Sequence, residues 1–92
     1  MAIRLLEVVI PTPLIRPVRE ALTERPAHGI WEESIADDLT LLRVLLSGEE
    51  TEAVCDRLEG RFASHEGFRL MLLPVEATIP RLTEPEPAEA LP

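Results

Sequence analysis

The 92-residue sequence contains no lysine, asparagine, glutamine or tyrosine, and only one tryptophan and two phenylalanines. All nine basic residues are arginines, and 17 acidic residues give a formal net charge of -8. Phosphate binding depends on clustered Lys and Arg, so this balance argues against nucleic-acid binding and against direct binding to anionic lipid surfaces. We interpret the exclusive use of arginine as codon bias of a GC-rich genome rather than as a binding device.

The sequence is equally poor in cysteine and in long apolar runs. The single cysteine, Cys55, excludes an internal disulfide and a cysteine-based metal cluster within one chain, and it fits a reducing compartment. No apolar run approaches the ~18–20 residues that a membrane-spanning helix needs. Arg4 and Glu7 interrupt the first apolar stretch, which is unlike a secretory signal. We therefore expect a cytoplasmic domain.

Four segments have the composition of β-strands: residues 3–10, 29–35, 39–46 and a last segment that opens at Gly67. In the first strand both alternating sets of side chains are largely apolar, which is typical of a central strand. A tight turn at residues 36–38 joins the second strand to the third.

Two segments have helical spacing. The first begins either at Thr12, with Pro13 at the first helical position, or at Pro17, and Pro26 ends it. The second begins at Ser47, which we expect to form a capping box with Glu50. Its inward stripe comprises Thr51, Val54, Cys55, Leu58 and Phe62.

The resulting order, βαββαβ, is the split βαβ pattern of ferredoxin-like folds. Right-handed crossovers give an α+β fold whose antiparallel sheet has the order 4-1-3-2, with both helices on one face. Strand four is then an edge strand, where alternate N–H groups point to solvent, so Pro74 removes no sheet bond; a bulge at Pro74 is the alternative. Residues 1–81 form the domain, and residues 82–92, with three glutamates and no basic residue, predict a disordered acidic tail or linker.

Ferredoxin-like domains serve many functions, so the fold alone decides nothing. Versions that bind RNA carry aromatic residues on the two central strands, which have none here. Versions that carry metals place paired cysteines after strand one, where this chain has IPTPLI, and His28 and His65 lie in separate loops. Pro11 and Pro13 remove two backbone donors from the loop in which amino-acid sensors of the ACT type bind a carboxylate, which weakens that function without excluding it.

Candidate catalytic residues are equally sparse. Cys55 has no nearby histidine in the sequence and lies on an apolar helical stripe, so we interpret it as a structural thiol. Glu32 and Glu33 are adjacent on a strand, where their side chains point to opposite faces and cannot form a carboxylate pair. We predict that the chain is not an enzyme and that it has no cofactor, no metal site and no catalytic residue.

Three stretches carry a resemblance to a known family: IRLLEVVIP, LLRVLLSGEETEAVCDRLEGRF and GFRLMLLPVEATIPR. Together they resemble the N-terminal soluble domain of a bacterial membrane-protein family known as domain of unknown function 389, over residues 3–81. The closing LLPVEATIPR before a Pro/Glu linker is the most specific part. The resemblance implies a location at the cytoplasmic face of the inner membrane, beside an attached membrane-spanning region. That family has no established catalytic or binding residues to carry over.

We expect one face of the sheet to remain apolar although no helix covers it. Leu6, Val8 and Ile10 of strand one, with three residues of strand three, should face the helices. The alternate set is also apolar apart from Glu7 and Arg43, which we expect to pair across the strands. Monomers seldom expose such a patch, so we predict a homo-oligomer, with a dimer favoured. The predicted self-association face comprises Leu5, Glu7, Val9, Leu41, Arg43 and Leu45.

The predicted function is therefore a non-enzymatic interaction or regulatory module that assembles or regulates an attached membrane region. The alternative is an ACT-like small-molecule sensor with its ligand bound between subunits. A stand-alone enzyme is a third class, to which the residues give little support. For the apolar face, the competing cover is the membrane region or its linker, which would leave the isolated chain monomeric.

Overall fold

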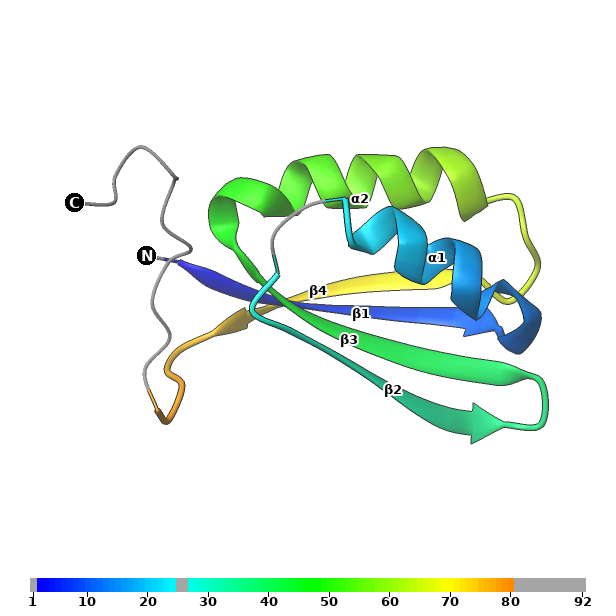
Figure 1. Ribbon diagram of the computed structural model, residues 1–92, viewed down its shortest axis with the longest axis horizontal. Coiled ribbons are helices and arrows are strands. Elements are labelled where there is room, and N and C mark those ends of the chain that lie inside the picture. The colour runs from blue at the N-terminus through cyan, green and yellow to red at the C-terminus, as the bar shows by residue number, and fades with distance from the viewer. Residues whose placement is uncertain (1, 25–26, 81–92) are drawn as a thin grey trace.

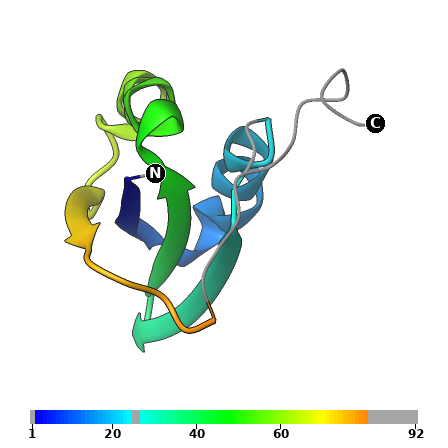
Figure 2. The same ribbon diagram turned by 90° about the vertical axis from the view of Figure 1, so that its left-hand side faces the viewer.

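The computed structural model describes residues 2–24 and 27–80. Four strands form one antiparallel sheet: β1 (Ile3–Pro11), β2 (Gly29–Ala36), β3 (Leu39–Ser47) and β4 (Arg69–Val75). Their spatial order is β2-β3-β1-β4, which confirms the predicted order. A 3-10 turn, η1 (Thr12–Leu14), precedes α1 (Ile15–Leu22), and α2 (Gly48–Phe62) follows β3. Both helices lie on the same face of the sheet, as in a ferredoxin-like fold (Figures 1 and 2).

The core lies between the two central strands and the helices. In the β1–β3 register Leu6 is paired with Val44 and Val8 with Leu42, and all four side chains are fully buried. This confirms which face of the sheet meets the helices. Full burial of a side chain of this size contributes about 1.5–3 kcal/mol. The helices complete the core with Val18, Ala21, Leu22, Val54, Leu58 and Phe62.

The regular helix α1 begins at Ile15, between the two predicted starts. Thr12 does not cap it, because its N–H donates to the carbonyl of Asp38 at 2.7 Å and its hydroxyl lies 3.0 Å from that of Thr40. Pro17 falls in the first turn of α1, where the backbone N–H has no partner within the helix, so proline is tolerated there. Pro26 and the predicted tail 82–92 lie outside the described residues.

The start of α2 differs from the predicted capping box. Ser47 is the N-cap residue, but its hydroxyl makes no capping hydrogen bond. The reason is that Ser47 is also the last residue of β3, paired with Ile3, so the strand sets the direction of its side chain. Backbone carbonyls bond to groups of the first turn instead. The Gly48 N–H donates to the Ala2 carbonyl at 2.7 Å, and the Thr51 hydroxyl donates to the Ser47 carbonyl.

The position of Pro74 follows from the hydrogen-bond pattern of the sheet. Consecutive residues of an antiparallel strand direct their N–H and C=O groups to opposite sides. The bonds from Thr12 to Asp38 and from Gly48 to Ala2 continue the β1–β3 ladder and show that even-numbered residues of β1 bond to β3. Odd-numbered residues of β1 therefore bond to β4. Pro74 is paired with the even-numbered Arg4, so its nitrogen points away from β1 to the free edge, and the register passes through it without a bulge.

We expect Pro74→Val to leave the free energy of unfolding within about 0.5 kcal/mol of the parent, because no β1–β4 hydrogen bond is gained. The new amide at position 74 should exchange rapidly with solvent although it lies inside a strand. Urea unfolding and amide hydrogen exchange measure the two effects. Leu73→Pro is the matched control, since the Leu73 N–H points inward to β1 and its loss should be strongly destabilising. Strong protection of the amide at position 74 in the monomer would contradict the edge assignment.

Candidate functional site

We call the sheet face that points away from the helices the open face. Side chains alternate along each strand, so the registers place on it the odd-numbered residues of β1, β3 and β4, and those of β2 as far as Glu33, before the register shifts between Ser34 and Ala36. Three rows run across it in the order β2, β3, β1, β4. They are Gly29, Leu45, Leu5 and Leu73; then Trp31, Arg43, Glu7 and Met71; then Glu33, Leu41, Val9 and Arg69.

The structure brings the six residues of the predicted self-association face together on the open face. Leu5, Val9 and Leu45 are half-buried, whereas Leu41 is only 8% exposed. The difference between the two β3 leucines follows from their neighbours. Leu41 lies between the side chains of Glu33 and Val9, but Leu45 is paired with Gly29, which has no side chain. Leu41 therefore lies on the open face, but little of its side chain is accessible from outside.

The most accessible apolar residues of the open face lie on the two edge strands and were not among the predicted six. Trp31 is 52% exposed, Leu73 is 40% exposed and Met71 is 38% exposed. The Trp31 ring lies over Gly29, where an added Cβ would come within 2.4 Å of it. Alternation within the two edge strands shows which of their residues share a face. It does not show which face of the sheet that is until the pairing with the neighbouring strand is known.

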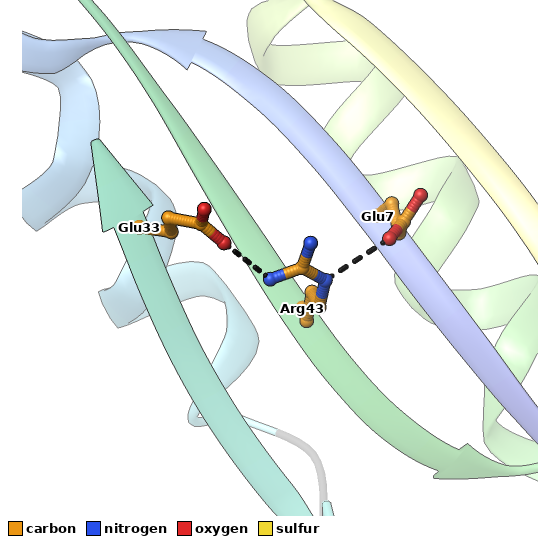
Figure 3. A network of polar contacts seen from close by, with 3 residues as sticks. All are labelled: Glu7, Glu33 and Arg43. Carbon is orange, nitrogen blue, oxygen red and sulfur yellow. Dashed lines mark hydrogen bonds and ion pairs between the residues drawn. The ribbon is translucent and has the colours of Figure 1, made fainter. Parts of the chain in front are cut away.

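A polar network occupies the centre of the open face. Arg43 Nε donates to Glu7 Oε2 at 3.1 Å, and Arg43 Nη1 donates to Glu33 Oε1 at 2.7 Å. Figure 3 shows the guanidinium between the two carboxylates. The predicted Glu7–Arg43 pair is confirmed, and Glu33 is an additional partner. The hydrogen bonds that Arg43 donates to Glu33 and then to Glu7 raise the pKa of Arg43, which favours the charged guanidinium.

The candidate catalytic residues do not come together. Burial, and next the charges of Asp56 and Glu59, raise the pKa of the half-buried Cys55 thiol, which is the opposite of what activates a nucleophile. Glu32 lies 3.8 Å from Arg19 of α1, whereas Glu33 contacts Arg43 on the open face. This confirms that the two glutamates point to opposite faces.

Residues 2–24 and 27–80 contain no group of three His, Cys, Asp or Glu side chains placed to hold a metal ion. No helix among them is both long and apolar enough to cross a membrane.

Comparisons with known proteins find likeness at the level of the fold. No protein-family model and no curated protein match the sequence. Among solved structures, one described as a PII-like signalling protein from Thermus thermophilus is 16% identical, with a TM-score of 0.74 over 82% of this chain and 87% of that one.

Two other structures show the same fold. CPII, a nitrogen regulatory PII-like protein from Thiomonas intermedia, was solved with ADP, AMP and bicarbonate bound. It is 10% identical, with a TM-score of 0.72 over 82% of this chain and 89% of that one. The C-terminal domain of the MgtC protein from Mycobacterium tuberculosis is 20% identical, with a TM-score of 0.64 over 83% and 89%.

Proposed function

We propose that this chain is a small interaction or regulatory module, not an enzyme, and that it associates with further copies of itself through the open face. The exposed apolar side chains of that face carry the proposal, because a sheet face left to water is ordinarily polar at alternating positions. The likeness to PII-like signalling folds supports a regulatory role. The resemblance to the membrane-protein family supports the further proposal that the module assembles or regulates an attached membrane region on the cytoplasmic side.

The exposed side chains set the strength of the association. Trp31, Met71 and Leu73 are each about half exposed, so complete burial of each would contribute roughly 0.8–1.5 kcal/mol, or half of the value for a fully exposed side chain. Three such residues from each of two subunits together contribute an amount similar to the association cost of about 4–15 kcal/mol, so they leave little net free energy for binding. The half-buried Leu5, Val9 and Leu45 must therefore also lie in the interface, and we expect weak, micromolar association. A two-fold dimer is the favoured form, because a single self-complementary patch suffices for it.

We expect Leu73→Glu and Trp31→Glu to convert the oligomer into a monomer, because each places a charge in the proposed interface without disturbing the buried core. Light scattering during size-exclusion chromatography measures the mass of each variant at several micromolar concentrations. Leu72→Glu is the matched control: it adds the same charge to the same strand at a residue that is 44% exposed but lies on the opposite face. A monomeric parent, or equal effects at positions 72 and 73, would contradict the proposal.

A second candidate function is a small-molecule sensor with its ligand bound between subunits. The observation that favours it is the nucleotide and bicarbonate bound to the Thiomonas CPII structure. A thermal-shift screen with ADP, AMP, bicarbonate and amino acids tests it, since a ligand at a hundredfold excess over its Kd stabilises the folded state by about 2.7 kcal/mol. If the sensor hypothesis holds, one ligand raises the Tm of the parent but not of Leu73→Glu. An unchanged Tm with every compound would contradict it.

A further inference from the structure

The outer edge of β4 has backbone groups that bond to no other described strand. β4 pairs with β1 alone, and its even-numbered residues direct their N–H and C=O groups away from β1. Leu70 and Leu72 thus present one donor and one acceptor each, and Pro74 presents a carbonyl only. Just before this stretch in the chain, the Phe68 N–H donates to the His65 carbonyl at 3.2 Å. Among the residues that the structure describes, the outward N–H groups of β4 belong to Leu70 and Leu72, so only a short segment can pair with this edge.

A groove accompanies this edge on the helix side of the sheet. It has a volume of about 320 Å³ between α2 and β4, and it is lined by Cys55, Glu59, Ala63, Phe68, Arg69 and Leu70. Leu72, the next residue of β4 on the same side, is 44% exposed. In an antiparallel strand added to this edge, the residues opposite Leu70 and Leu72 would point their side chains into the groove. The residues between them would extend the open face beside Met71 and Leu73.

The helix wall of the groove is acidic. Glu52, Asp56 and Glu59 are exposed, and their spacing of four and three residues places them on one side of α2, together with Cys55 and Ala63. Because α2 and β4 run in opposite directions (Figure 1), Glu59 lies beside Leu70 and Glu52 lies toward the other end of the strand. None of the described residues forms an ion pair with Asp56 or Glu59. Burial is the main cause of the raised pKa of the Cys55 thiol, and the nearby charges of Asp56 and Glu59 add to it.

This groove suits arginine or lysine, because the three carboxylates of α2 outnumber Arg69, the one basic residue of its lining. Such a side chain can lay its aliphatic stem on Leu70 or Leu72 while its charged end reaches the carboxylates of α2. Residues 82–92 of the same chain have the wrong charge, with three glutamates and no basic residue, and β4 of a second copy offers a single basic residue, Arg69. Charge complementarity therefore favours a different protein as the occupant.

We propose that the outer edge of β4 and the α2–β4 groove bind an extended segment of a partner protein by strand addition. The segment carries basic side chains at the alternate positions that face the groove and apolar side chains at the positions that face away from the helices. Pro74 ends the pairing because it has no N–H to donate. This surface borders the proposed self-association interface at Met71 and Leu73 but lies far from Trp31 on β2, so a variant at Trp31 tests the two proposals separately.

A labelled peptide tests the proposal directly. A fluorescein-labelled Val-Arg-Val-Arg-Val-Arg-Val peptide should increase in anisotropy on addition of the protein, whereas Val-Glu-Val-Glu-Val-Glu-Val should not. The amides of Leu70 and Leu72 should exchange rapidly in the free protein and at least about tenfold more slowly in the complex, because each becomes hydrogen-bonded. The amide at position 71 bonds to β1 in both states and serves as the internal control.

Three variants locate the binding surface. Leu72→Pro removes an outward donor without touching the β1–β4 ladder, and Glu59→Arg reverses the charge of the groove wall. Each should weaken peptide binding by about tenfold, which corresponds to about 1.4 kcal/mol. Glu20→Arg makes the same charge change on the exposed side of α1 and should leave binding unchanged. If Leu72→Pro does not fold, Glu59→Arg and the exchange of the Leu70 amide decide the question.

Several outcomes would overturn the proposal. They are the absence of binding of the arginine peptide, equal binding of the glutamate peptide, and equal effects of Glu59→Arg and Glu20→Arg. A change of oligomeric state in Leu72→Pro would likewise show that a second copy of the chain occupies the edge. The Trp31→Glu variant, on the far edge strand β2, should still bind the peptide, and this separates failure of the strand-addition proposal from failure of the open-face proposal.

Discussion

The register in which β1 pairs with β3 decides which side chains meet the helices and which lie on the open face. Leu6 beside Val44 and Val8 beside Leu42 place fully buried aliphatic side chains under α1 and α2. A shift of one residue would exchange the two faces of the strands and bring Arg43 under the helices. The fold therefore depends on this pairing, and so does the composition of the open face, because the helices can cover only one side of two strands that are apolar on both.

The Arg43 network gives the open face a polar centre within apolar rows. A surface that lies over it must leave the guanidinium and both carboxylates hydrogen-bonded, because an unpaired charge in a buried interface is strongly destabilising. Leu5 and Leu73 in the neighbouring row can pack against apolar side chains in many positions. The charged centre can be covered only by a surface that keeps its groups hydrogen-bonded. In the association proposed above, the apolar side chains would provide the free energy, and the charged centre would restrict the register in which two copies can meet. The sheet edges need separate protection, which β4 obtains in part from Pro74.

Much of the fold could be predicted from the sequence because it depends on local signals. Residues 3–10 are apolar in both alternating sets, which identified a central strand, the right-handed crossovers gave the order of the sheet, and the position of Pro74 fitted an edge. The capping hydroxyl of Ser47 could not be predicted, because this residue ends a strand as well as starting a helix. The edge residues of the candidate site, among them Trp31 and Leu73, were missed because a strand's face is defined only by its register with its neighbour. The burial of Leu41 likewise depends on the side chains across from it, which no pattern within its own strand reveals.

The central claim, that the open face is covered by a second copy of the chain, is tested most directly by the fluorescence of Trp31. It is the one tryptophan in the chain, and it lies on that face with half of its surface exposed. Acrylamide quenching can be measured as the protein is concentrated from nanomolar to high micromolar levels. Burial of the ring on association predicts a quenching constant that falls severalfold, with a shift of the emission to shorter wavelength. A quenching constant that stays the same over the whole range would contradict the claim, because it would leave the open face of the isolated chain in contact with water.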